Sequence, residues 1–253
     1  MINLTDRKLW NSIWNKEKKK RRNNIFYKYY YKEYDNVLQN ILNQLKIEKA
    51  DILDLGCGSG NLLLRLYKLK PWHCYYGIDY SETAINKAKE KFINTNIYNN
   101  LYFGDIFNYN FNKKFDLIIS AGLIEHFTNP NSIIERHIYY SKQNGLIAIS
   151  VPYFSNPFIK FLLKIFNSPI LKTHNFNILS INSLYKTLKI NNLENIKVYS
   201  CMGPRLPIIN KNNFSGFVYS IIYKFWNILS VFFPKKLRLW NSTIWSESRN
   251  SIP

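Results

Sequence analysis

The chain has 253 residues, 46% of them hydrophobic, which is enough for one large domain with a buried core. Its 35 Lys and Arg outnumber 16 Asp and Glu. The formal charge of +19 has two explanations: a partner that is nucleic acid, an anionic membrane or an acidic substrate, with nucleic acid the less favoured of these, or composition alone, since Lys and Asn are abundant throughout. Three cysteines without metal-ligand spacing predict reduced thiols in a cytosolic protein. The first residues, MINLTDRKLW, lack the long apolar run of a signal peptide.

Residues 1–48 are predicted to form a helical cap ahead of the main domain. An aromatic cluster, FYKYYYKEY, is followed by apolar residues at the helical period, namely Val37, Leu38, Ile41, Leu42 and Leu45. The tyrosines of this segment either pack on the sheet or close over a ligand. For Trp10 and Trp14 the same two roles are open, packing or contact with a ligand, in their case on the substrate side.

The segment ADILDLGCGSG, residues 50–60, organises the rest of the prediction. A short apolar run that ends in an acid predicts a buried parallel strand, and a leucine-rich helix is expected over residues 61–70. Between them stand Gly56, Gly58 and Gly60, which tolerate positive φ and let the backbone approach a ligand. The helix N-terminus adds free N–H groups. Strand, glycine turn and helix predict the first half of a nucleotide-binding βαβ unit.

The glycine pattern favours S-adenosylmethionine over a dinucleotide. The dinucleotide fingerprint G-x-G-x-x-G needs a glycine where the chain has Asn61, which disfavours a nicotinamide-dependent reductase. Asp54, just before the glycines, would repel a pyrophosphate, but it suits a ligand with sulfonium and ammonium groups. A second predicted strand, residues 75–79, ends in Asp79 about 20 residues after the glycines, where a ribose-binding acid belongs.

The remaining chain predicts alternating helices and strands. Ser81 is suited to be the N-cap of an amphipathic helix, and Asn144-Gly145 is expected to end a helix over residues 131–142. Further strands are expected at residues 98–103, 115–120, 146–151, 195–201 and 242–247, with a helix at 181–189. The order predicts an α/β fold, a Rossmann-like, doubly wound sheet of seven mostly parallel strands with helices on both faces.

Two segments interrupt this pattern, residues 152–180 and residues 202–238. Both leave the sheet at its carboxyl edge, where open α/β sheets bind ligands, so both are expected as helical insertions on the substrate side. The second is apolar, but Lys224 and a polar stripe argue against a membrane span and favour either a cap over the substrate or an interfacial helix. The cofactor-binding core is therefore predicted over residues 49–201 and 239–253.

Four ordered motifs make residues 50–151 resemble the class I S-adenosylmethionine-dependent methyltransferases, particularly the small-molecule branch around the ubiquinone-biosynthesis O-methyltransferases. They are the glycine turn, YYGID, GDI and SAGLIEHF. The resemblance implies an antiparallel last strand and an N-terminal segment that closes over the cofactor. It also implies that the ribose lies at Asp79, the adenine at Asp105 and the methionine end at Asp54. The implied cofactor-binding residues are Asp54, Gly56, Gly58, Gly60, Asp79, Tyr80, Asp105, Ile106 and Ser120.

Glu125 and His126 are the candidate catalytic residues. Because histidine titrates near neutral pH, His126 is suited to act as general base on a substrate hydroxyl. Two alternatives stay open: the pair holds a hard cation, as in some ubiquinone-pathway relatives, or it only orients the loop and the cofactor. The predicted site contains no metal. His137 is expected on a helix surface, whereas His73 and His174 carry no informative local pattern.

The sequence therefore predicts a methyltransferase that acts on a small-molecule or lipid-linked acceptor, with oxygen as the acceptor atom by resemblance. Catalysis would consist mainly of holding the acceptor against the sulfonium. The alternatives are an RNA methyltransferase, suggested by charge and tyrosines, and a non-catalytic methyltransferase-like subunit that binds a partner through residues 202–238. The expected location is the cytoplasm, with peripheral membrane contact if residues 202–238 form an interfacial helix.

Overall fold

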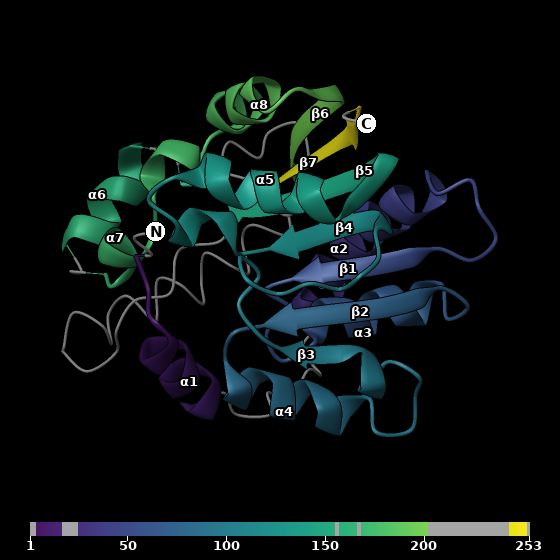
Figure 1. Cartoon of the computed structure of the whole chain (residues 1–253). Coiled ribbons are helices and arrows are strands. Elements are labelled where there is room, and N and C mark those ends of the chain that lie inside the picture. Colours follow the sequence, from purple (N-terminus) through teal and green to yellow (C-terminus); the bar gives the residue numbers. More distant parts are fainter. Residues whose placement is uncertain (1–3, 17–24, 155–156, 166–167, 202–242, 252–253) are drawn as a thin grey trace.

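The computed structural model describes residues 4–16, 25–154, 157–165, 168–201 and 243–251 (Figure 1). Helices and strands alternate through most of this chain. The helices are α1 (Arg7–Lys16), α2 (Ile25–Asn43), α3 (Asn61–Leu69), α4 (Glu82–Lys91), α5 (Pro130–Tyr140), α6 (Pro157–Ile165), α7 (Ile170–Thr173) and α8 (Ile181–Ile190), with short 3₁₀ turns η1 (Tyr98–Asn100), η2 (Ile124–His126) and η3 (Phe176–Ile178). The strands are β1 (Asp51–Leu55), β2 (Cys74–Asp79), β3 (Leu101–Phe103), β4 (Phe115–Ala121), β5 (Ser141–Pro152), β6 (Leu193–Cys201) and β7 (Thr243–Asn250).

A seven-stranded sheet in the order β3-β2-β1-β4-β5-β7-β6 forms the centre of the structure. Neighbouring strands from β3 to β5 are parallel, whereas β7 runs antiparallel to both β5 and β6. The predicted doubly wound, mostly parallel sheet with an antiparallel last strand is confirmed. Because β1 has β2 on one side and β4 on the other, the strand order reverses there, which opens a crevice at the carboxyl ends of these strands.

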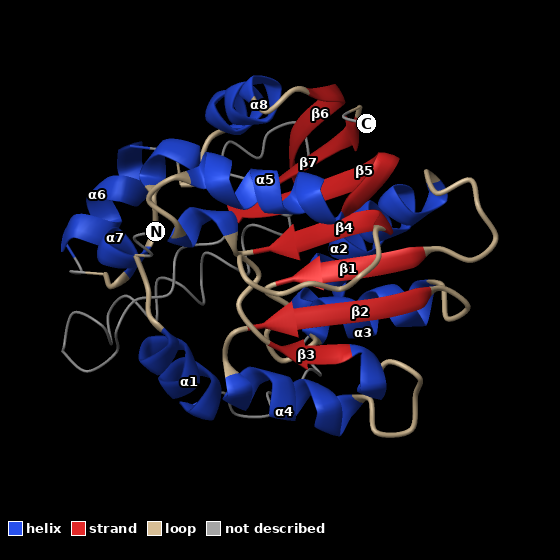
Figure 2. Ribbon diagram, viewed as in Figure 1, coloured by secondary structure: helices blue, strands red, loops and turns tan. Residues whose placement is uncertain are grey.

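Helices cover both faces of this sheet (Figure 2). Alternate residues of β1 point to opposite sides: Ile52 packs in one core cluster with α2, α3 and α4, and Leu53 packs in another with α5 and α8. Both residues are fully buried. Burial on both faces explains why this strand reads as a continuous apolar run rather than an alternating one.

Two local predictions are wrong. Helix α5 ends at Tyr140, with Ser141 as its C-cap, instead of at Asn144-Gly145. Asn144 has a φ of 59° and lies inside β5, at an irregularity in the pairing of β5 with β4. Phe115 pairs with Ser141, but Leu117 pairs with Leu146, so β5 has extra residues between these two pairs. The left-handed conformation of Asn144 therefore belongs to an irregularity of the strand and not to a helix end. The third strand is also shorter than expected, since residues 98–100 form η1.

Helices α1, α6 and α7 lie beside the arrowheads of the parallel strands (Figure 1). The insertion after β5, predicted over residues 152–180, thus borders the carboxyl edge of the sheet. The insertion predicted over residues 202–238 lies outside the described residues. Within the part of the chain that is described, no helix combines the length and apolarity needed to cross a bilayer.

Candidate active site

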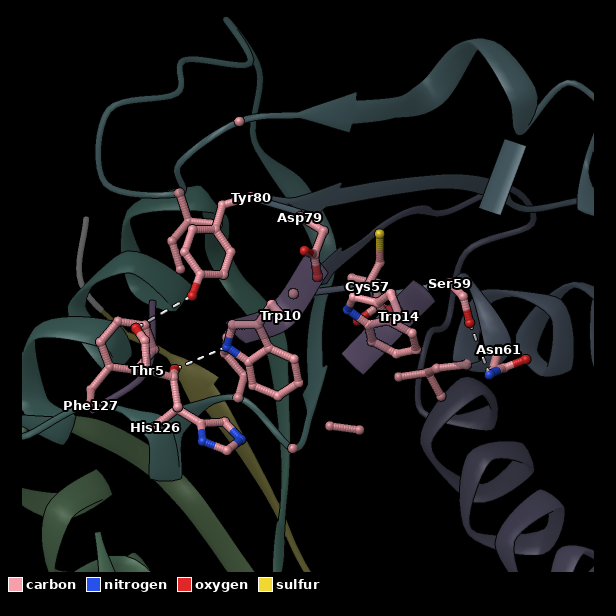
Figure 3. A pocket seen from close by; sticks show the side chains of 18 of the residues that line it. Thr5, Trp10, Trp14, Cys57, Ser59, Asn61, Asp79, Tyr80, His126 and Phe127 are labelled. Atoms are coloured by element: carbon pink, nitrogen blue, oxygen red, sulfur yellow. Dashed lines mark hydrogen bonds between the residues drawn. The ribbon is translucent and has the colours of Figure 1, made fainter. Parts of the chain in front are cut away.

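A cavity of about 390 Å³ opens at the carboxyl ends of β1, β2 and β4 (Figure 3). Its walls come from the segment around α1, from α2, from the glycine turn and the start of α3, and from the loops after β2, β3 and β4. This is the crevice that the reversal of strand order creates. The sheet thus places side chains from distant parts of the sequence around one ligand-sized space.

The glycine turn forms the floor of this cavity. Gly56, Gly58 and Gly60 all have positive φ, at 70°, 53° and 73°. A methyl group added at Gly58 would lie 2.6 Å from Cζ2 of Trp14, so the indole packs directly on the backbone there. Of the three glycines, only Gly56 lines the cavity; Gly58 lies under Trp14, and Gly60 packs against α4.

Asp79, the last residue of β2, lines the cavity beside the glycine turn. Its Oδ2 accepts the backbone N–H of Gly58 at 2.9 Å, and its Oδ1 accepts that of Ser81 at 2.8 Å. Burial raises the pKa of Asp79 to about 6, although these two N–H groups act in the opposite direction. A carboxylate accepts about four hydrogen bonds, so it retains acceptor capacity for the hydroxyls of a ligand.

Asp54 on β1 lines the same cavity and is 1% exposed. Its Oδ2 has no hydrogen-bond partner among the described residues. Burial, and secondarily the charge of Asp79, raise the pKa of Asp54 well above its usual value. A buried acid without a partner is costly, and a cationic ligand would supply the missing interaction.

The loop after β3 forms a less polar wall. Asp105 is exposed to solvent at the cavity, and its Oδ1 accepts the N–H of Phe107 at 3.0 Å. The side chains of Ile106 and Phe107 line the cavity next to it. Tyr80 also lines the cavity, with its hydroxyl 3.4 Å from the carbonyl oxygen of Thr5. Apolar side chains next to a carboxylate suit a flat ring that carries an amino group.

Ser120 does not line the cavity. It is fully buried, and its hydroxyl donates to Nε2 of His137 at 2.8 Å. Nδ1 of His137 lies 2.7 Å from the carbonyl oxygen of Ile133, which can only accept, so Nδ1 carries the proton. The expectation of a surface His137 is therefore wrong, because α5 packs this ring onto β4, and burial lowers its pKa to about 4. Ala121 and Gly122 line the cavity at the end of β4 instead.

His126, in η2, borders the cavity at the end opposite Asn61 (Figure 3). Its Nδ1 lies 2.8 Å from the carbonyl oxygen of Thr173, so Nδ1 donates a proton and Nε2 keeps a lone pair. Burial lowers the pKa of His126, which favours the neutral ring. The rings of Trp10 and His126 pack in a T-shaped arrangement, with centroids 4.9 Å apart.

Glu125 is the neighbour of His126 in η2, but it does not line the cavity. It is 1% exposed, its Oε2 has no hydrogen-bond partner among the described residues, and burial raises its pKa to about 8. One possible ligand atom from each of Glu125, His126 and His174 lies within 4.8 Å of the others. Such a set of a carboxylate and two imidazoles is capable of holding a divalent cation.

Helix α1 and the residues just before it border the cavity and are attached to the loops around it. The N–H of Leu4 donates to the carbonyl of His126 at 2.9 Å, and the hydroxyl of Ser81 donates to Oδ1 of Asn11 at 2.6 Å. Trp10 and Trp14 stack at 6.4 Å between centroids, and both line the cavity. The N-terminal segment therefore borders the space for a ligand.

Comparison with known proteins identifies the family. A model of a methyltransferase domain matches residues 46–186. The chain belongs to this methyltransferase family. Malonyl-[acyl-carrier protein] O-methyltransferase of Acetivibrio thermocellus is 29% identical over 119 residues, which cover 47% of this chain and 41% of that protein. The match thus spans less than half the length of that relative.

Two further comparisons cover more of the chain. Malonyl-[acyl-carrier protein] O-methyltransferase 1 of Ilyobacter polytropus is 26% identical over 210 residues, 73% of this chain and 78% of that protein. The plantazolicin methyltransferase BpumL, solved in complex with SAH, has a TM-score of 0.57 at 21% identity and covers 96% of this chain and 95% of its own. That structural likeness shows that the methyltransferase fold is shared.

The methyltransferase cavity gathers most of the predicted site residues. Those that line it are Asp54, Gly56, Asp79, Tyr80, Asp105, Ile106 and His126, whereas Gly58, Gly60, Ser120 and Glu125 do not. Sequence reasoning missed Arg65, Phe107 and His174. Arg65 follows Asn61 by one helical turn on the same face of α3, a spacing that could have pointed to it. His174 lies in the insertion after β5, and the residues around it form no sequence pattern that points to the site.

Proposed function

We propose that this chain transfers the methyl group of S-adenosylmethionine to an oxygen atom of a small-molecule or lipid-linked acceptor. The observation that carries the proposal is the buried carboxylate of Asp54, which faces the cavity without a partner for Oδ2 among the described residues. The ammonium and sulfonium groups of S-adenosylmethionine would satisfy this acidic end of the cavity, whereas the pyrophosphate of a dinucleotide would be repelled. The relatives named as O-methyltransferases support transfer to oxygen, and the SAH bound in BpumL supports S-adenosylmethionine as the cofactor.

The cavity walls suggest how the cofactor would be held. Asp79 would accept hydrogen bonds from the ribose hydroxyls, since the N–H groups of Gly58 and Ser81 already fix its orientation. Asp105, with the apolar side chain of Ile106 beside it, would hold the adenine. The methionine end would then lie along Asp54 and the glycine turn, with Tyr80 closing the ribose side.

His126 is proposed as the general base. A neutral imidazole with a lone pair on Nε2 can take the proton of an acceptor hydroxyl while the oxygen attacks the methyl carbon and the carbon–sulfur bond breaks, which leaves S-adenosylhomocysteine. Glu125 would position the loop behind it. Holding a cation with His174 is the alternative role of this pair, since the three side chains lie close enough together.

The surroundings of His126 favour an acceptor with an apolar part. Trp10, Leu123 and Phe127 line the cavity near it, and they would exclude water from the reacting atoms. The lipid-linked form of the acceptor, the peripheral membrane contact and the cytoplasmic location rest on residues 202–238 and on composition, because this segment lies outside the described residues. We also propose residues 1–48 as the cap and 49–201 with 239–253 as the core of the enzyme.

Methyl transfer is tested by incubating the protein with S-adenosylmethionine labelled in its methyl group and with separate panels of hydroxylated small molecules, carboxylic acids, lipid precursors and RNA. We expect label in one of the first three panels, at oxygen. His126→Ala should abolish labelling of a hydroxyl acceptor, whose proton the base must take. Label that appears only in RNA, or only at nitrogen, would overturn the acceptor class. A folded protein that labels none of them and does not bind S-adenosylhomocysteine would indicate a non-catalytic subunit.

A further inference from the structure

Arg65 brings a positive charge into an otherwise acidic cavity. It lines the cavity from α3, one helical turn after Asn61, which Figure 3 places at the end opposite His126. Among the described residues that line this cavity, Arg65 is the one Lys or Arg, whereas Asp54, Asp79 and Asp105 are acidic. The cavity therefore presents an anion-binding group at the end away from the proposed base.

We infer that Arg65 binds the α-carboxylate of the amino-acid end of the cofactor, while Asp54 binds its ammonium. The inference rests on the proposed function, because it takes the ligand to be S-adenosylmethionine. An amino-acid head is a zwitterion, and a site that offers one acid and one arginine matches both of its charges. The five N–H groups of a guanidinium fit a carboxylate with two parallel hydrogen bonds.

The guanidinium of Arg65 is held in place by residues of α2. Its Nη1 donates to Oδ1 of Asp35 at 2.6 Å, and its Cζ lies 3.7 Å from the centre of the Tyr31 ring and 5.8 Å from that of Tyr34. Stacking on aromatic rings orients a guanidinium without using its N–H groups. Tyr31 and Tyr34 line the cavity as well, so this arrangement borders the space for a ligand.

The contact with Asp35 leaves most N–H groups of the Arg65 guanidinium available. Asp35 takes one N–H, and in the described parts of the chain no second hydrogen-bond acceptor contacts Arg65. The Arg65 side chain is 18% exposed, so an approaching carboxylate would meet a guanidinium that is already partly desolvated. Partial desolvation strengthens a charge-assisted hydrogen bond relative to one in water.

A purely structural role is the competing explanation. The ion pair with Asp35 joins α2 to α3, and it could serve only to brace the two helices. Partly exposed ion pairs contribute little to stability, so a brace would be a weak one. The two roles differ in a measurable way, because a brace does not distinguish a ligand with a carboxylate from one without.

Calorimetric titration with S-adenosylhomocysteine and with its decarboxylated analogue separates them. In the wild type, the intact ligand should bind more tightly. Arg65→Met should lower the affinity for S-adenosylhomocysteine roughly 10- to 100-fold, while the affinity for the analogue should change by no more than about twofold. Arg65→Lys keeps the charge but loses the fork, so it should fall between. Lys68→Met, which changes an exposed position on the same helix, is the control.

Equal affinity of the wild type for both ligands would overturn the inference. An equal loss of affinity for both ligands in Arg65→Met would overturn it too. If Arg65→Met does not fold, the wild-type comparison and Arg65→Lys still decide the question. A wild type that binds neither ligand would refute the proposed function itself, which is a different outcome from a failure of the Arg65 inference.

Discussion

The backbone N–H of Gly58 donates to Oδ2 of Asp79 at 2.9 Å, and this bond ties the glycine turn after β1 to the end of β2. The turn and the acid are therefore one unit: the same contact shapes the cavity floor and orients the carboxylate toward the ligand. A change at either residue is expected to disturb the other.

Gly58→Ala should destabilise the protein and impair cofactor binding. The positive φ alone costs an alanine about 1–2 kcal/mol, and the new methyl group would also lie 2.6 Å from Trp14. Gly122→Ala is a matched control, because φ is 72° there but the nearest atom to the methyl would be 3.7 Å away. Denaturant unfolding of both variants should show a larger loss of free energy at Gly58. Equal losses would indicate that the Trp14 contact has no energetic weight.

Glu125→Gln should stabilise the protein at pH 8. Because the pKa of Glu125 rises from 4.5 to about 8 on folding, the folded state binds a proton more tightly than the unfolded state between these values. Stability contributed by the protonated acid is complete below pH 4.5 and is lost as the pH rises toward 8. A glutamine mimics the protonated acid, so its advantage should grow over this range to the order of 2–4 kcal/mol.

The measurement for this prediction is the free energy of unfolding of both proteins from pH 5 to pH 8, with exposed Glu90→Gln as the control. A difference between wild type and Glu125→Gln that does not change with pH would contradict the burial of an unpartnered carboxyl group.

His126→Ala should lower the turnover rate by about 10²- to 10⁴-fold, the usual contribution of a general base, with little change in S-adenosylhomocysteine affinity. The proton-transfer role also predicts that a chelator leaves the wild-type rate unchanged. Activity that disappears on chelation and returns with a divalent cation would instead assign His126, with Glu125 and His174, to a metal site.

Binding of S-adenosylhomocysteine should change the emission of Trp14. The indole packs on Gly58, where the methionine end of the cofactor is proposed to lie, so the ligand must alter its contacts. Titration followed by tryptophan fluorescence should lose most of its signal in Trp14→Phe. A full signal in that variant would place the change at another of the six tryptophans.

The sequence was most informative where local pattern determines structure. Asp79 and the glycine turn were predictable because strand, turn and helix follow one another within a short segment, and Ser81 proved to be the N-cap that its sequence suggested, accepting the N–H of Ala84 at 3.3 Å. These features depend on backbone conformation and capping, which a few adjacent residues fix.

Features that depend on packing between distant segments were not predictable. His137 and Ser120 face each other only because α5 packs on β4, and the Thr173 carbonyl reaches His126 only through the insertion after β5. The Arg65 guanidinium meets Asp35 only because α2 lies beside α3. A single sequence shows which residue types are present, but it does not show which long-range neighbours bury them or orient their protons.

Calorimetric titration of the wild type, Asp79→Ala and Asp51→Asn with S-adenosylhomocysteine decides whether Asp79 belongs to a cofactor site. Asp51 is a matched control, because it stands at the opposite end of β1 from the cavity and pairs with Lys113. We expect micromolar binding by the wild type and by Asp51→Asn, and an affinity at least about tenfold lower in Asp79→Ala. Absence of binding by folded wild type, or equal binding by all three, would contradict this expectation.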